Sequence, residues 1–131
     1  MTDLPVLDSD GLRALAQRSA AVTAACACAE ADLSCWTSTP LSFPESQLKD
    51  VGTLLADPYD EPGFAEYHPH GTRYESGDAP IAPRYFPYNR CNVSACAICG
   101  RCYLRYTEAG GYFVDRRIRA LNRPGLVVDA D

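Results

Sequence analysis

The chain has 131 residues, of which 47% are hydrophobic, and a formal net charge of −5, so it is long enough to bury a core without disulfide bonds. No apolar run approaches the roughly 18 residues that a membrane span requires, which predicts a soluble protein without a membrane partner. The acidic start of the chain lacks the basic and apolar regions of a signal peptide, so we expect a cytoplasmic, reducing location.

The charge is unevenly divided along the chain. Residues 1–80 carry four basic and thirteen acidic residues, whereas residues 81–131 carry eight arginines and four acidic residues. Two explanations fit this division: the acidic half neutralises the basic half within the molecule, or the basic half holds an anionic partner. We favour neutralisation within the molecule.

Residues 1–36 are predicted to form a helical layer. Asp8 or Ser9 can cap its first turn by accepting a hydrogen bond from an unpaired backbone N–H group. Apolar residues then recur at a spacing that places them on one side of a helix: Leu12, Leu15, Ala16, Val22, Cys26, Ala29 and Leu33. We expect this side to face the core, whether the segment is one helix or two helices joined near Ser19.

Small residues gather on the opposite side of the same predicted helix: Ala21, Ala24, Cys28, Ala31 and Cys35. This small-residue face is predicted to contact another element, an unknown protein partner or a second copy in a homodimer. On a helix, Cys28 and Cys35 lie about 10 Å apart and Cys26 points elsewhere, so one metal ion cannot bind all three. We therefore expect these cysteines to be small buried hydrophobic residues.

Residues 37–90 carry weaker signals for regular structure. A short helix is predicted from about Glu45, and residues 57–90 contain six of the ten prolines. Proline fixes φ and lacks an N–H group, so this stretch is predicted to be extended and rich in turns. Its aromatic residues can anchor it, and we expect an ordered irregular segment that wraps over the domain.

Four of the seven cysteines lie between positions 91 and 102. Clustered cysteines in a reducing location are metal ligands or redox thiols more often than structural bridges. The run Cys96-Ala97-Ile98-Cys99-Gly100 is a Cys-x-x-Cys-Gly knuckle. In such a knuckle two thiolates converge on a metal ion, and glycine tolerates the unusual backbone angles that follow.

A β-hairpin is predicted directly after the knuckle. A three-residue loop at 109–111 places Arg105 opposite Asp115 and Cys102 opposite Ile118. A two-residue loop would place Arg105 opposite another arginine, and like charges that face each other are unfavourable. We therefore predict the three-residue loop.

A knuckle that leads into a β-hairpin resembles the zinc-ribbon and rubredoxin-like proteins. The resemblance covers about thirty residues, and these families normally bring a second Cys-x-x-Cys pair from another hairpin, which this chain lacks. Cys91, five residues before Cys96, is the expected third ligand beside Cys96 and Cys99. Cys102 is the expected fourth ligand of a structural Zn²⁺, and His68 is the alternative in a site with three cysteines and one histidine.

A [2Fe-2S] cluster is the main alternative to zinc. The spacing Cys91-x4-Cys96-x2-Cys99 matches the first three ligands of a plant-type ferredoxin, in which a fourth cysteine follows well downstream. No cysteine follows Cys102 in this chain. A ferredoxin-like electron carrier therefore stays the second hypothesis.

Binding of single-stranded nucleic acid is a third hypothesis. Arginine and tyrosine alternate in the C-terminal part of the chain: Arg84, Tyr85, Tyr88, Arg90, Arg101, Tyr103, Arg105, Tyr106 and Tyr112. Aromatic rings can stack on unpaired bases while guanidinium groups neutralise phosphate. Alternating aromatic residues on a hairpin also pack small cores, so we do not favour this hypothesis.

Helical signals precede strand signals, which predicts a single α+β domain over residues 1–131. An N-terminal helical layer, residues 1–36, is expected to pack on a small antiparallel sheet in residues 91–131, with the irregular segment 37–90 between them. The sequence contains no Gly-rich phosphate loop, Gly-x-Ser-x-Gly motif or His-Glu-x-x-His motif. We therefore predict a non-catalytic binding or interaction module with a structural zinc site.

Overall fold

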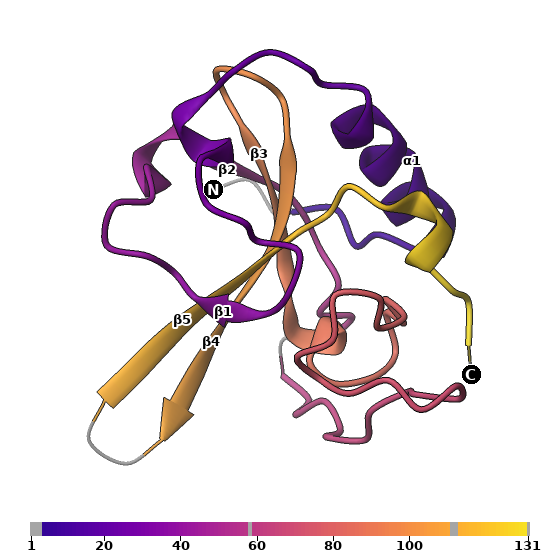
Figure 1. The fold of residues 1–131 in the computed structure, drawn as a ribbon. Coiled ribbons are helices and arrows are strands. Elements are labelled where there is room, and N and C mark those ends of the chain that lie inside the picture. Colours follow the sequence, from indigo (N-terminus) through magenta and orange to yellow (C-terminus); the bar gives the residue numbers. More distant parts are fainter. Residues whose placement is uncertain (1–3, 58, 111–112, 131) are drawn as a thin grey trace.

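The computed structural model describes residues 4–57, 59–110 and 113–130. Five antiparallel strands form one sheet in the order β1-β5-β4-β3-β2 (Figure 1). The strands are β1 Thr37–Ser38, β2 Leu48–Thr53, β3 Asn92–Cys96, β4 Cys102–Gly110 and β5 Phe113–Ala120. Together with one α-helix, this sheet gives a mixed α+β structure in which strands predominate.

The α-helix α1, Ser9–Ala20, begins where the sequence predicts a cap. The Asp8 side chain accepts a hydrogen bond from the Gly11 N–H group, at 2.7 Å. Leu12 and Ala16 are fully buried in the core, and the helix contacts β4 and the 3-10 turn η4, Pro124–Leu126. In the described parts of the chain, no helix is long and apolar enough to cross a membrane.

The helix does not continue to residue 36, as the helical layer required. Between Ala20 and β1 the only regular element is a 3-10 turn, η1 Ala27–Ala29, and Cys26 has an extended backbone. Backbone bonding to the sheet takes over here, because the Ala120 N–H group donates to the Leu33 carbonyl at 2.7 Å. The small residues between positions 21 and 35 therefore form no helical face, and the partner predicted for that face stays a prediction.

The central part of the sheet is buried on both faces. Adjacent residues of a strand point to opposite sides, and in β4 both Tyr103 and Leu104 are buried. The first core lies on the Leu104 side; its members are Leu12, Ala16, Trp36, Leu54, Ile81, Tyr88, Cys91, Val93, Cys102, Leu104, Tyr106, Leu121 and Val127. The second core lies on the Tyr103 side; its members are Cys28, Leu33, Phe43, Leu48, Cys96, Tyr103 and Ile118.

The hairpin of β4 and β5 has a different register from the predicted one. Arg105 lies opposite Ile118, and Glu108 lies opposite Asp115. Strand pairing runs to Gly110 and Phe113, so the prediction of a loop at 109–111 is wrong, although residues 111–112 lie outside the described residues. The observed register puts Ile118 on the side of the second core, where it is fully buried. Burial on that face therefore outweighs the local charge pairing on which the prediction relied.

Residues 37–90 contain more regular structure than the sequence indicates. The short helix expected from Glu45 is a 3-10 turn, η2 Glu45–Gln47, and β2 follows it directly. Residues 54–87 contain no helix and no strand where the structure describes them, apart from an isolated bridge at Ile81. This stretch still contributes Ile81 to the first core, with Tyr74 and Phe86 packed against it.

Ion pairs within the molecule connect the two oppositely charged halves of the chain. Arg105 of β4 lies 3.2 Å from Asp50 and 3.9 Å from Glu45, and Arg116 of β5 lies 3.1 Å from Glu45. These ion pairs join the edge of the acidic half to the hairpin of the basic half. The explanation that we favoured from the sequence is supported by these contacts.

Arg119 of β5 is a buried charge that ties several loops to the sheet. The residue is 1% exposed. Its guanidinium group donates to the carbonyl groups of Ser34, Gly77 and Ala79 and to the Tyr88 hydroxyl group. Among the residues that the structure describes, no carboxylate pairs with it. This one side chain therefore ties three loop carbonyl groups to β5 at once.

Replacing Arg119 by methionine should lower the free energy of unfolding by about 3 kcal/mol, because several buried acceptors lose their donor. Urea denaturation followed by circular dichroism measures this change. Arg116→Met is the matched control, because Arg116 has a 68% exposed side chain and should cost about 0.5 kcal/mol or less. Equal stability of the two variants would contradict a structural role for the buried guanidinium group.

Candidate metal centre

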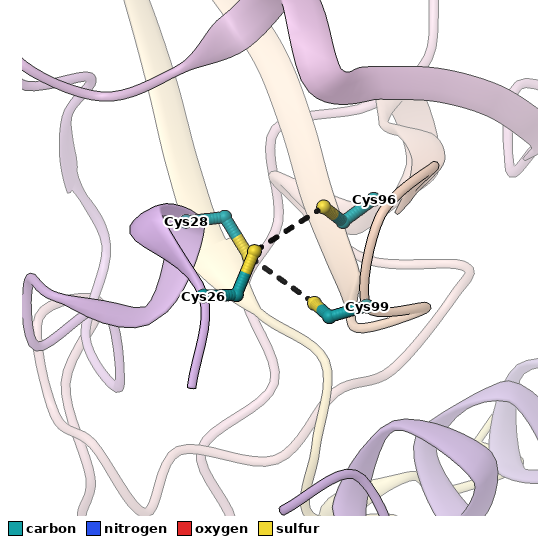
Figure 2. A group of neighbouring side chains, drawn as sticks. All are labelled: Cys26, Cys28, Cys96 and Cys99. Carbon is teal, nitrogen blue, oxygen red and sulfur yellow. Dashed lines mark hydrogen bonds between the residues drawn. The ribbon is translucent and has the colours of Figure 1, made fainter. Parts of the chain in front are cut away.

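The Cys-x-x-Cys-Gly knuckle is the turn that connects β3 to β4. The Cys96 N–H group donates to the Arg101 carbonyl, and the Gly100 N–H group donates to the Cys96 carbonyl, both at 2.8 Å. Gly100 has a φ of 88°, in the left-handed region that glycine tolerates best. This tight turn places the Cys96 and Cys99 side chains next to each other (Figure 2).

A second pair of cysteines, Cys26 and Cys28, faces the knuckle from the N-terminal part of the chain (Figure 2). Cys26 is extended, with φ −153° and ψ 146°, and Cys28 lies in the 3-10 turn η1. The Tyr103 hydroxyl group donates to the Cys28 carbonyl at 3.0 Å and so fixes η1 against β4. The change from extended to turned backbone allows both thiols to face the knuckle.

The four sulfur atoms converge on one point. The Sγ atoms of Cys26, Cys28, Cys96 and Cys99 all lie within 4.8 Å of one another. The Cys26–Cys96 distance is 3.8 Å and the Cys28–Cys99 distance is 3.5 Å. Four thiolates at about 2.3 Å from a tetrahedral Zn²⁺ are separated by about 3.8 Å. All four thiols are free, and their spacing matches a shared metal ion rather than the bond of about 2.05 Å in a disulfide.

The thiols of the site differ in acidity. Burial raises the pKa of Cys28 to about 12. Burial also acts to raise the pKa of Cys99, but hydrogen bonds from the Arg101 backbone and from the Cys28 thiol outweigh it and lower this pKa to about 7. Cys99 therefore loses its proton more readily than Cys28 and can begin the binding of a metal ion, because the thiolate is the ligating form.

The structure brings together only two of the predicted ligands, Cys96 and Cys99. Cys91 is fully buried in the first core, and its thiol donates to the Pro87 carbonyl at 3.2 Å. Cys102 also belongs to the first core, and its thiol donates to the Gly100 carbonyl at 3.7 Å. Neither belongs to the four-cysteine group, because both side chains point to the other side of the sheet from the second core.

The alternative ligand, His68, has both ring nitrogen atoms engaged elsewhere. Nδ1 lies 2.8 Å from the Thr72 hydroxyl group, and Nε2 lies 2.8 Å from a Glu66 carboxylate oxygen. These contacts hold the ring within its own loop. His68 is therefore outside the candidate centre.

Sequence reasoning missed Cys26 and Cys28 because a helix places residues i and i+2 on different sides. Two signals could have found them. The spacing Cys26-Ala27-Cys28 is itself a compact pair of metal ligands, and the resemblance to zinc ribbons implied a second pair. The missing pair was sought near the knuckle, whereas it lies about seventy positions earlier in the chain.

The tyrosines of the nucleic-acid hypothesis are mostly part of the two cores. Tyr88, Tyr103 and Tyr106 are 4%, 3% and 7% exposed. Buried rings cannot stack on bases, and Arg105 is engaged with Asp50 and Ser94. These positions therefore offer little support for a surface that binds single strands.

Comparisons with protein-family models, with curated proteins and with solved structures find no match to this chain. None of these comparisons confirms the resemblance to zinc ribbons that the knuckle and its hairpin suggested. The candidate centre is argued from its own geometry.

Substitution of single cysteines separates the geometric ligand set from the sequence-based one. Cys28→Ala and Cys96→Ala should each remove most of the bound metal, because they delete a ligand from the converged group. Cys91→Ala and Cys102→Ala should retain it, after allowance for any loss of stability in the first core. Metal content of the purified variants, measured by mass spectrometry, checks this prediction. Loss of metal in Cys91→Ala with retention in Cys28→Ala would instead support the ligands predicted from the sequence.

Metal-free protein should show unequal thiol reactivity. The lowered pKa of Cys99 means that its thiolate predominates above about pH 7, whereas the raised pKa of Cys28 keeps that thiol protonated until about pH 12. Alkylation by iodoacetamide at pH 7.5, mapped by peptide mass spectrometry, should therefore modify Cys99 well before Cys28. Equal rates at the two positions would contradict this assignment.

Proposed function

We propose that this chain is a zinc-binding protein in which Cys26, Cys28, Cys96 and Cys99 hold one structural Zn²⁺. The observation that carries the proposal is the convergence of four Sγ atoms within 4.8 Å of one another. Four thiolates at this spacing would repel one another strongly without a cation between them. The residues present therefore suit a soft, tetrahedral metal ion.

The spacing favours a single ion over a [2Fe-2S] cluster. In such a cluster each iron takes two of the four cysteines, so the sulfur atoms separate into two pairs across the two irons. Here each sulfur atom of the N-terminal pair lies close to a sulfur atom of the knuckle pair. The two distances are 3.8 Å for Cys26–Cys96 and 3.5 Å for Cys28–Cys99. Four thiolates in a tetrahedron suit Zn²⁺ and a single iron ion, and we propose zinc because it takes this coordination in structural sites.

The role that we propose for the ion is to join two distant parts of the chain. Residues 21–36 contain only the 3-10 turn η1 as regular helix, so they have little local structure of their own. A metal ion shared with the knuckle would anchor this stretch over the second core. Four cysteine ligands leave no open coordination position for a substrate or an activated water molecule, which supports a non-catalytic binding or interaction module. We place it in a reducing, cytoplasmic location, where free thiols persist.

Metal analysis of protein purified without chelators tests the proposal. We expect close to one zinc per chain and no absorbance in the visible range. One iron per chain with a red colour would identify a mononuclear iron site, and two irons with sulfide would identify the cluster. Folded protein that contains none of these metals and does not take up added Zn²⁺ would overturn the proposal.

Removal of the metal should loosen one region in particular. Because the ion would link η1 to the knuckle, a chelator should speed amide hydrogen exchange in residues 22–34 and 96–101 more than in α1. Exchange measured by mass spectrometry before and after chelation checks this, and re-addition of Zn²⁺ should reverse it. An equal increase in hydrogen exchange over the whole chain would contradict a local role and would indicate that the metal supports global folding.

A further inference from the structure

The Gln47 side chain touches two of the four sulfur atoms. The thiols of Cys26 and Cys96 both donate to its Oε1 atom, at 3.7 and 3.5 Å. Its backbone is fixed, because the Gln47 carbonyl accepts a 2.7 Å hydrogen bond from the Ala97 N–H group of the knuckle. Gln47 therefore sits at the point where the two cysteine pairs meet.

The Tyr103 side chain brings a hydrogen-bond donor to a third sulfur atom, and Arg101 follows the fourth cysteine in the chain. The Tyr103 hydroxyl group lies 3.2 Å from the Cys28 Sγ atom. Arg101 lies two residues after Cys99, and its guanidinium group donates to the Val22 carbonyl at 3.4 Å, on the segment that leads to Cys26. Among the described residues, Arg101 Nη1 is the buried side-chain nitrogen that has no hydrogen-bond partner, so the guanidinium group has an unused donor. Three of the four sulfur atoms thus have a polar side chain within hydrogen-bond distance, and Arg101 has an unused donor two residues after the fourth cysteine, Cys99.

Metal binding changes the hydrogen-bond partner that each sulfur atom requires, from an acceptor to a donor. A thiol can donate its proton to Gln47 Oε1, but a metal-bound thiolate has no proton and only accepts. An amide oxygen facing two thiolates would then be repulsive. A half-turn of the glutamine amide replaces Oε1 by Nε2, which carries two donors at the same place. Tyr103 has one hydroxyl proton, which can turn from the Cys28 carbonyl to the Cys28 sulfur atom 3.2 Å away, and Arg101 carries donors only.

We propose that Gln47, Tyr103 and Arg101 are the positioning residues of the metal centre, and that the Gln47 amide donates to the Cys26 and Cys96 thiolates when the metal is bound. This inference rests on the proposed zinc site. Four thiolates and one Zn²⁺ carry a net charge of −2, which is costly beside a hydrophobic core. Donors aimed at the sulfur atoms spread that charge and orient the ligands, and loss of such an outer partner typically weakens metal binding 10- to 100-fold.

Substitution of Gln47 by glutamate tests the direction of the hydrogen bonds. Glutamate has nearly the same shape, but its carboxylate only accepts. Gln47→Glu should therefore weaken Zn²⁺ binding about tenfold or more, while Gln47→Leu, which neither donates nor accepts, should fall between wild type and Gln47→Glu. Competition with a chromophoric chelator measures the affinities. Gln17→Glu is the matched control, because Gln17 is exposed on α1 and the substitution adds the same charge.

The absorption spectrum of the Co²⁺-substituted protein provides a second measurement. Residues that only stabilise the fold would not change this spectrum. In the Co²⁺-substituted protein, loss of a donor to a thiolate makes that sulfur a better electron donor. The thiolate-to-cobalt charge-transfer band of Tyr103→Phe and of Arg101→Gln should therefore shift to longer wavelength than in wild type. Arg101→Lys, which keeps the charge and a donor, should restore most of the wild-type position. These variants also test the proposal if Gln47→Glu does not fold.

The outcomes separate this inference from the proposed function. Wild-type protein that binds neither Zn²⁺ nor Co²⁺ would overturn both. Wild-type protein that binds Zn²⁺, with Gln47→Glu equal in affinity to Gln17→Glu and no band shift in Tyr103→Phe or Arg101→Gln, would overturn the positioning role alone. The affinity order wild type, Gln47→Leu, Gln47→Glu, together with the band shifts, would establish it.

Discussion

Convergence of two cysteine pairs on one point is the constraint around which the N-terminal third of the chain is arranged. Four Sγ atoms share a space in which each lies within 4.8 Å of the others. To reach that space, the chain leaves its helix at Ala20 and holds Cys26 in an extended conformation before η1. An alanine-rich segment that favours a helix by propensity is thus shaped by contacts with a distant knuckle.

The double-sided sheet explains where the centre sits. Cys28 and Cys96 belong to the second core, together with Tyr103 and Ile118, whereas Cys91 and Cys102 belong to the first. The sheet therefore separates thiols that are close in sequence and unites thiols that are far apart. The 3-10 turn η2 lies against the knuckle through the Gln47 carbonyl, which brings an amide side chain to the same side of the sheet as the sulfur atoms.

Several features of the fold follow from the sequence because they depend on neighbouring residues. The cap at Asp8, the start of α1 and the tight turn after Cys99 each need only a few adjacent residues. The hairpin after the knuckle was also predicted, but the predicted register was wrong. Local charge pairing favoured Arg105 opposite Asp115, whereas burial of Ile118 on the second face decides the observed pairing, and that face exists only when residues 26–48 cover it.

By itself, the sequence determined half of the candidate centre and the kind of chemistry that it supports. Cys96 and Cys99 lie in one turn, so their spacing predicts convergence whatever surrounds them. Only the tertiary structure decided the other half. Cys91 and Cys102 are nearer in the chain, but strand alternation turns their side chains into the first core. Cys26 and Cys28 join the site because hydrogen bonds to β4 and β5 hold their segment against the sheet, and such long-range bonds leave no periodic trace in the sequence.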